Sequence, residues 1–250
     1  MLTINTHEGI ACVQLAHGKV NAFDRELMNG WISQLDVLEK ADCSAVVLTG
    51  SGSIFSAGVD LRRLSEGGRD YIQEFLPLLA EAFFKTFTFP KPLVAAVNGH
   101  AIAGGCILAC ACDYRVMAEG AGRIGAPELS VGVPFPSMAL EILRLTLPAH
   151  RLQTMIYRGM TCTPNEALEN GFVDELAPPD ALQGRALAMA GRLGGVPHVS
   201  FALTKRLIRQ PSLDRVIRYM RSIDEEVQEA WLSPAVQSAV HDYVERTLRK

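Results

Sequence analysis

The sequence predicts an α/β fold that ends in a region made only of helices. Two runs of apolar β-type residues, 45–49 and 93–97, each lead into a glycine-bearing turn and then a helical pattern. From residue 196 onward, apolar residues recur at the spacing of amphipathic helices. We expect residues 1–195 to form the core, and residues 196–250 to pack on that core or on a neighbouring chain.

The N-terminal segment is predicted to form one β-β-α unit. Leu2–Ile4 and Ile10–Leu15 flank a polar turn that ends in Gly9 and should pair as a hairpin. Asp24 is expected to cap the following helix, because its short side chain can accept hydrogen bonds from first-turn N–H groups. The apolar residues that recur at helical spacing behind it are Leu27, Trp31, Leu35 and Leu38.

A similar order of elements continues along the chain, although no sequence repeat accompanies it. Strand 45–49 precedes a helix predicted over 71–87, where aromatic and leucine residues recur every four positions. Strand 93–97 precedes a buried helix that opens at Gly104, and residues 114–118 are predicted as the next strand.

The second half of the chain is expected to be mostly helical. Its predicted helices cover 136–147, 164–170, 180–194, 199–209, 213–232 and 234–250. Thr163 and Glu166 form a capping-box pattern at the start of the second of these, and Gly171 ends it. One apolar stripe in the last region consists of Val216, Met220, Ile223 and Val227. This stripe should be covered by another element.

The stretch Pro92–Asp113 joins a strand, a glycine-bearing turn and a buried helix. Gly104 and Gly105 open that helix, so their N–H groups lack partners within the helix and lie at its positive end. A ligand could also approach a backbone without side chains closely. The pattern indicates an anion site built from backbone, and the alternative is that two glycines let the helix pack against a strand.

A second glycine turn lies in the stretch Ile54–Leu64. Gly58 can free the following N–H, that of Val59, to point at a ligand. Because this turn also follows a buried strand, we expect it to lie near the turn at Gly104. The two N–H groups could then share one oxygen atom.

Together with further motifs, these stretches resemble the crotonase (enoyl-CoA hydratase/isomerase) superfamily. The matching segments are F-S-A-G-V-D-L at 55–61, N-G-H-A-I-A-G-G at 98–105, K-V-N-A at 19–22, C-D-Y-R at 112–115 and P-E-L at 127–129. The resemblance spans residues 10–175. It implies a spiral of ββα units followed by a C-terminal helical region that makes a homotrimer or a dimer of trimers.

The resemblance also assigns roles in an acyl-CoA site. It places the two N–H donors of an oxyanion hole on Val59 and Gly104, and the catalytic carboxylate on Glu128. The implied substrate-binding residues are Ala22, Ala57, Gly58, Asp60, Leu61, Arg62, Gly105, Ile107, Phe135 and Met138. Coenzyme A enters as part of the substrate, so neither a separate cofactor nor a metal is expected. Arg62 and Arg63, beside the turn at Gly58, are the better candidates for the CoA phosphates by position. Further basic residues in the C-terminal region could also meet these phosphates, although such residues more often form a solvated helix face: Lys205, Arg206, Arg209, Arg215, Arg218 and Arg221.

Glu128 and Ile107 favour one reaction within this superfamily. Apolar neighbours of Glu128, for which Ile107, Phe135 and Met138 are candidates, would raise its pKa toward that of a useful base. In the hydratases of this superfamily a second glutamate stands three residues after the oxyanion glycine, where this chain has Ile107. One carboxylate suffices to move a proton from C2 to C4 of a 3-enoyl-CoA, so the sequence predicts an enoyl-CoA isomerase of fatty acid β-oxidation.

Three alternatives stay open within the same superfamily: a hydratase, an acyl-CoA hydrolase and a non-catalytic acyl-CoA-binding protein. A serine hydrolase of another class would need a nucleophile such as Ser56 beside His100, but no G-x-S-x-G elbow is present. A second base from a distant residue such as Glu81 would bring back the hydratase reaction.

Composition is that of a globular protein with a sizeable core. A net charge of −3 gives no general attraction to nucleic acid or to an anionic membrane, and neither partner is expected. The six cysteines show no metal-site or disulfide spacing and should behave as small buried hydrophobes. Without a signal peptide or a membrane-spanning run, a cytoplasmic location is expected.

Overall fold

The computed structural model describes residues 1–220 and 222–248, and it confirms the predicted α/β class. Its larger sheet has the order β1-β2-β3-β5-β7-β10. The strands are β1 (Leu2–His7), β2 (Ile10–Leu15), β3 (Ala45–Thr49), β5 (Leu93–Val97), β7 (Tyr114–Ala118) and β10 (Glu175–Ala177). The hairpin β1–β2 is antiparallel, whereas every other neighbouring pair is parallel.

A smaller sheet, in the order β4-β6-β8-β9, lies where the sequence suggested only turns. Its strands are β4 (Ile54–Ser56), β6 (His100–Ile102), β8 (Ile124–Gly125) and β9 (Thr161–Cys162). The first three each follow a strand of the larger sheet, and each is followed in turn by a helix. The chain therefore repeats a β-β-α unit, as expected for a spiral, and the glycine turns at Gly58 and Gly104 lie between strand and helix.

The helices of the core are α1 (Arg25–Lys40), α2 (Leu61–Thr88), α3 (Gly104–Ala111), α4 (Glu128–Val131), α5 (Ser137–Thr146), α6 (Ala149–Tyr157), α7 (Pro164–Asn170) and α8 (Leu182–Gly194). Two predicted caps are confirmed: Asp24 accepts a hydrogen bond from the N–H of Leu27, and Thr163 forms a capping box with Glu166. The helix α6 was not predicted.

Helix α2 begins ten residues before the predicted start at Tyr71. The carboxylate of Asp60 accepts hydrogen bonds from the N–H groups of Arg62 and Arg63 and so starts the helix directly after the turn at Gly58. Gly68 then adopts φ 60° and ψ −150°, which makes a kink inside the helix.

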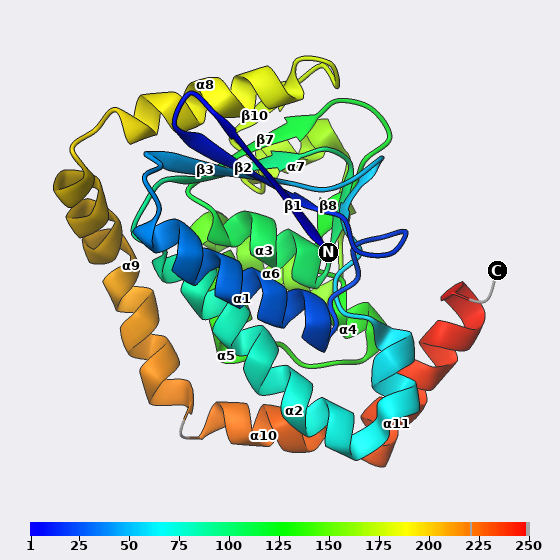
Figure 1. Cartoon of the computed structure of the whole chain (residues 1–250). Helices are drawn as coiled ribbons and strands as arrows, with labels where there is room; N and C mark the ends of the chain where they lie inside the picture. Colours follow the sequence, from blue (N-terminus) through cyan, green and yellow to red (C-terminus); the bar gives the residue numbers. More distant parts are fainter. Residues whose placement is uncertain (221, 249–250) are drawn as a thin grey trace.

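The larger sheet is covered on both faces, as Figure 1 shows. On one face α8 packs through the small residues Ala186 and Ala190 against alternate strand residues such as Val47 and Val94. The opposite face contributes Val46, Leu48 and their counterparts on β5 to the main core. Because both faces are buried, the strands have the continuous apolar sequences that made them recognisable.

The C-terminal region consists of α9 (His198–Met220), α10 (Ile223–Trp231), α11 (Pro234–Tyr243) and a π-helical turn, Val244–Leu248. Helix α9 continues through Pro211, where we expected a break. Contacts on both sides hold it, because Arg209 and Ser212 are buried. Two residues of the predicted apolar stripe are covered: Val216 is buried, and Val227 packs on the core. Ile223 is 45% exposed. The side chain of Met220 lies outside the described residues.

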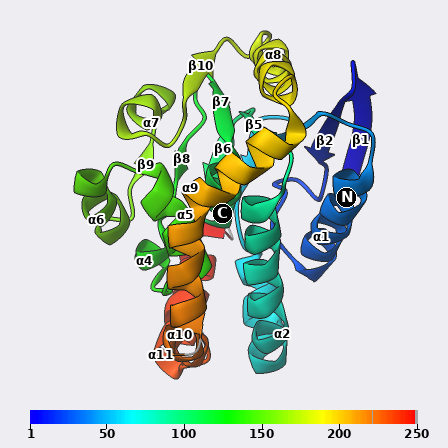
Figure 2. The ribbon, with the colours of Figure 1, turned by 90° about the vertical axis from the view of Figure 1, so that its left-hand side faces the viewer.

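Helices α9–α11 run down one side of the molecule and then beneath it to reach α2 and α4 (Figures 1 and 2). No helix among the described residues is both long and apolar enough to cross a membrane. The C-terminal region thus lies against the core of its own chain and reaches the segment that carries Glu128.

Candidate active site

A cavity of about 590 Å³ opens between the two glycine turns, α4 and the C-terminal helices. Nine of the predicted site residues line it: Ala22, Ala57, Val59, Asp60, Leu61, Arg62, Gly104, Ile107 and Glu128. The fold therefore brings residues that lie more than 100 positions apart to the wall of one cavity.

The turns at Gly58 and Gly104 are in direct contact. A Cβ atom built on Gly58 would lie 2.7 Å from the carbonyl oxygen of Ile102 and 2.9 Å from the backbone nitrogen of Gly104. Gly58 also has φ +81°, a conformation that a side chain would strain. Gly105 is equally constrained, because a Cβ there would lie 2.4 Å from the carbonyl oxygen of Ser56. Both glycine turns thus need glycine in order to meet.

The N–H groups of Val59 and Gly104 have no hydrogen-bond partner in the described part of the chain. Around Val59, the N–H of Phe23 donates to the carbonyl of Gly58 at 2.7 Å, and the N–H of Asp60 donates to the carbonyl of Phe23 at 2.9 Å. These bonds fix the turn and leave the N–H of Val59 unused. Gly104 is the first residue of α3, where an N–H has no partner within the helix.

Asn21 holds the first turn from behind. It is fully buried, has φ 49°, and donates from its side chain to the carbonyls of Ile54 and Phe55 at 3.2 and 3.1 Å. The hydroxyl of Ser56 donates to the carbonyl of Asn21 at 2.8 Å and accepts from the N–H of Gly58 at 3.0 Å. Through Asn21, the segment K-V-N-A at 19–22 therefore holds the turn that carries Val59 in place by hydrogen bonds.

Glu128 begins the short helix α4 and is 8% exposed. Its Oε2 atom is buried and has no hydrogen-bond partner among the described residues. Burial in these surroundings raises the pKa of Glu128 to about 8. A carboxyl group of this kind can exchange a proton near neutral pH with a molecule in the cavity.

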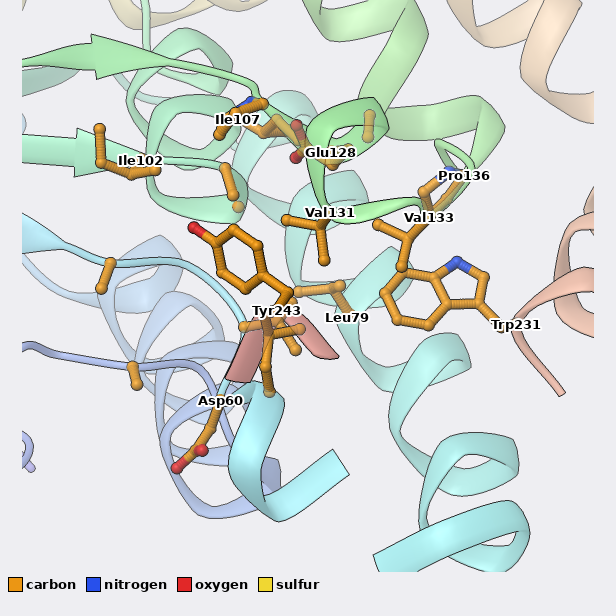
Figure 3. A pocket seen from close by; sticks show the side chains of 18 of the residues that line it. Asp60, Leu79, Ile102, Ile107, Glu128, Val131, Val133, Pro136, Trp231 and Tyr243 are labelled. Atoms are coloured by element: carbon orange, nitrogen blue, oxygen red, sulfur yellow. The ribbon is translucent and has the colours of Figure 1, made fainter. Parts of the chain in front are cut away.

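Ile107 lies beside Glu128 in the cavity, as predicted (Figure 3). Phe135 and Met138 do not line the cavity. Met138 is buried in the hydrophobic core, and the partly buried Phe135 packs against that core. Apolar residues that do line the cavity together with Glu128 include Val131, Val133, Pro136 and Ala139. The rise in the pKa of Glu128 has the predicted cause, burial. Of the three predicted apolar neighbours, Ile107 lines the cavity with Glu128, whereas Phe135 and Met138 do not.

The carboxylates that line the cavity are Glu128 and Asp60 within the described ranges 1–220 and 222–248. Asp60 is occupied in capping α2, and its side chain points away from Glu128 in Figure 3. Glu81 is exposed and does not line the cavity. The position that a second acid would need beside Glu128 is filled by Ile107.

Sequence reasoning missed the part of the wall that the C-terminal helices supply. Trp231 and Tyr243 both line the cavity, and the indole N–H of Trp231 donates to the carbonyl of Pro134 at 3.2 Å. Leu79 and Phe83 of α2 complete the apolar end. The only signal in the sequence was an aromatic residue on an apolar helix face, which more often belongs to a core.

The basic residues separate into two groups. Lys19 and Arg62 are exposed and line the mouth of the cavity. Arg63 instead pairs with Glu26 at 2.6 Å and with Asp24 at 3.2 Å.

Farther along, the predicted phosphate candidates Lys205 and Arg209 are buried, and each bonds to Asp113 at 2.8 Å. Burial lowers the pKa of Lys205 to about 8 despite this ion pair. These two cations fasten α9 to the core and lie away from the cavity.

Ser56 and His100, which the sequence offered for a hydrolase, do not form a nucleophilic site in the described part of the chain. The hydroxyl of Ser56 is bonded to backbone groups, and His100 does not line the cavity. The described residues include no cluster of His, Cys, Asp and Glu that could hold a metal ion. All six cysteines are unpaired, and four of them are buried, as expected of small apolar residues.

Comparisons of the sequence and of the fold with known proteins identify one family. Residues 5–249 match the family described as Enoyl-CoA hydratase/isomerase. The chain is 30% identical to mouse "Enoyl-CoA delta isomerase 1, mitochondrial", over 97% of this chain and 85% of that protein. It is 36% identical to a "Putative enoyl-CoA hydratase" of Thermus thermophilus, over 75% of each chain. The crystal structure of human mitochondrial delta3-delta2-enoyl-CoA isomerase, 26% identical, superposes with a TM-score of 0.93 and covers 99% of this chain and 98% of that one.

Proposed function

Because the chain belongs to the enoyl-CoA hydratase/isomerase family, the crotonase superfamily, we propose that it moves the double bond of a 3-enoyl-CoA to the 2-position. One observation carries the proposal. Glu128 is the only carboxylate in the apolar part of the described cavity, its Oε2 is unbonded, and Ile107 occupies the place of a second acid. Such a site can move a proton but has little with which to activate water.

The two free N–H groups are the proposed oxyanion hole. When a proton leaves C2 of the thioester, negative charge develops on the carbonyl oxygen. Donors fixed in advance by the contact between Gly58 and Gly104 would stabilise that charge without rearranging. The N–H groups of Val59 and Gly104 would bind this oxygen, and one such donor contributes roughly 10²–10³ in rate.

Glu128 is the proposed proton carrier. Its carboxylate takes a proton from C2, the electrons of that C–H bond form a dienolate, and the charge rests on the thioester oxygen. The carboxylic acid then returns the proton to C4, which leaves the double bond between C2 and C3. A pKa of about 8 suits both steps, because the group must accept and release a proton near neutral pH.

The two ends of the cavity suit the two parts of the substrate. Lys19 and Arg62 at the mouth could meet the phosphates of coenzyme A. The acyl chain would occupy the end lined by Leu79, Phe83 and Trp231. The proposed reaction is a proton transfer within one molecule, so it requires no cofactor and no metal. Because the proposed substrate is an enoyl-CoA ester, the reaction would belong to fatty acid β-oxidation.

A surface for self-association is proposed on α9. Its exposed apolar residues include Val199, Leu203, Leu207, Ile208 and Ile217. Apolar residues gathered in this way are typical of a surface that another chain covers. We propose a homotrimer or a dimer of trimers, and a monomer in sedimentation at micromolar concentration would contradict it. The cytoplasmic location stays a prediction.

An assay of the purified protein against 3-enoyl-, 2-enoyl- and saturated acyl-CoA esters tests the function. The proposal predicts conversion of 3-enoyl-CoA to 2-enoyl-CoA, with little hydration and no release of coenzyme A. Efficient formation of 3-hydroxyacyl-CoA would make the protein a hydratase, and free coenzyme A would make it a hydrolase. Binding without turnover of any ester would make it an acyl-CoA-binding protein.

A further inference from the structure

Tyr243 brings a hydroxyl group from the C-terminal helices into the cavity. It is the last residue of α11, and it lines the same cavity as Val59, Gly104 and Glu128. Figure 3 shows its ring rising from beside Leu79, with the hydroxyl directed into the cavity on the side of Ile102. The hydroxyl has no hydrogen-bond partner within residues 1–220 and 222–248, where the structure is described.

The helix that carries Tyr243 is fixed to the segment that follows Glu128. Gly132 ends α4 with φ 92° and packs directly against α11. A Cβ atom built on Gly132 would lie only 2.8 Å from the Cβ of Ala239. The N–H and hydroxyl of Ser137 donate to Asp224 at 2.8 and 2.5 Å. Since Trp231 is bonded to Pro134 as well, the segment 132–137 is tied to α10 and α11 along its length. Tyr243 therefore has a set position relative to Glu128.

The chemistry of the cavity indicates what this hydroxyl can bond. Apart from Glu128, the inner lining near Tyr243 is made of Leu79, Val131 and similar apolar side chains. A hydrocarbon chain offers no acceptor, so a hydroxyl buried against one would lose its hydrogen bond to water without gaining another. The thioester oxygen, by contrast, is an acceptor. The hydroxyl points toward Ile102, which precedes the proposed donor Gly104 by two residues.

We propose that Tyr243 is a third hydrogen-bond donor to the thioester oxygen, supplied by α11 in addition to the two backbone N–H groups. This inference rests on the proposed function. The hydroxyl donates a hydrogen bond, which strengthens as the oxygen becomes an enolate oxygen. In this arrangement the C-terminal region completes the catalytic site of its own chain, in addition to any part it has in assembly.

The kinetic test replaces only the hydroxyl. The variant Tyr243→Phe keeps the ring, so kcat for 3-enoyl-CoA should fall roughly tenfold, with KM within about twofold of wild type. The matched control is Tyr157→Phe, which makes the same change at a tyrosine that is 70% exposed and outside the cavity. An unchanged kcat in Tyr243→Phe, or a change confined to KM, would overturn the proposal.

A second test does not depend on isomerisation. Acetoacetyl-CoA is a thioester whose enolate is stable and absorbs in the near ultraviolet, so the bound enolate can be titrated against pH. The pH at which half of the bound ligand is enolate should be higher in Tyr243→Phe than in wild type by roughly one unit. An equal midpoint in the two proteins would overturn the proposal, as would a wild type that binds this ligand without forming the enolate.

The two tests separate the two proposals. If the midpoint shifts but no 3-enoyl-CoA is isomerised, then Tyr243 is an enolate donor in an enzyme with another reaction. If 3-enoyl-CoA is isomerised but neither kcat nor the midpoint responds to Tyr243→Phe, then the proposed function stands and the third donor is wrong. Equal affinity of both proteins for coenzyme A alone checks that the site is otherwise intact.

Discussion

Gly58 and Gly104 meet so closely that a Cβ atom on Gly58 would lie 2.9 Å from the backbone nitrogen of Gly104. Two turns from separate β-β-α units are thereby set side by side, each ending in an N–H that the described chain does not use. The spacing between the proposed donors is set by backbone contact, which makes it insensitive to most side-chain changes but sensitive to any side chain at Gly58.

The first prediction concerns this contact. Gly58→Ala should push the two turns apart and lower kcat by roughly 10²-fold, because a displacement of about 1 Å can cost that much. Gly9→Ala is the matched control: Gly9 has nearly the same φ, +78°, but a Cβ there meets nothing within 4 Å. Both variants strain the backbone. Equal losses of activity would therefore show that backbone strain, and not the contact between the two turns, causes the loss. Steady-state kinetics with circular dichroism as a fold check measures this.

The second prediction is the pH dependence of the reaction. Burial raises the pKa of Glu128 to about 8, and the base that removes the C2 proton is the carboxylate form. The value of kcat/KM should therefore rise with pH up to about 8 and level off above it. A profile that is flat between pH 6 and about 9 would show that another group is the base.

The third prediction links the same carboxyl group to stability. Its folded-state pKa of about 8 is above the ordinary value of 4.5, so between these pH values the folded protein binds more protons than the unfolded chain. The contribution of Glu128 to the free energy of unfolding must then fall as pH rises from about 4.5 to about 8.

The neutral variant Glu128→Gln removes that dependence. It should be more stable than wild type at pH 8, by about 1–4 kcal/mol, and nearly equal to it at pH 4.5. Chemical denaturation at the two pH values measures the difference. A variant that is less stable than wild type at pH 8 would mean that the buried carboxylate has a stabilising partner in the folded protein.

The fourth prediction concerns the place of the missing second acid. Ile107 is 2% exposed and lies beside Glu128, so Ile107→Glu would add a carboxylate within reach of a water molecule at the same site. Hydration of 2-enoyl-CoA should rise by up to roughly 10²-fold over wild type, at some cost in stability from the buried charge. Ile107→Gln has the same shape without the charge and should not show the gain. Equal hydration rates in both variants would contradict the explanation.

The parts of this fold that the sequence predicted are those with a local signal. Strands β3 and β5 have the predicted bounds because a buried parallel strand is a continuous apolar run. The start of α2 was misplaced because Gly67 and Gly68 resemble a helix break, whereas Asp60 caps the helix upstream and the glycines are accommodated as a kink. Pro211 likewise resembles a break, but buried contacts on both sides carry α9 through it.

The candidate site divides in the same way. Val59, Gly104 and Glu128 were identifiable because glycine turns and a P-E dipeptide are local patterns, and the structure brings them to one cavity. Met138 was expected on the cavity side, but one position along a helix turns a side chain by about 100°, and Ala139 faces the cavity instead. Tyr243 reaches the site only through tertiary packing of α11, which no local pattern encodes.

The most direct test of the central claim is the rate of 3-enoyl-CoA isomerisation by Glu128→Gln. If this residue alone carries the proton, the rate should fall by roughly 10²–10⁴-fold with little change in affinity for the ester. Glu119→Gln makes the same change at an exposed glutamate outside the cavity and should behave as wild type. If Glu128→Gln isomerises 3-enoyl-CoA as fast as wild type, the single-carboxylate account is wrong and the base lies elsewhere in the chain.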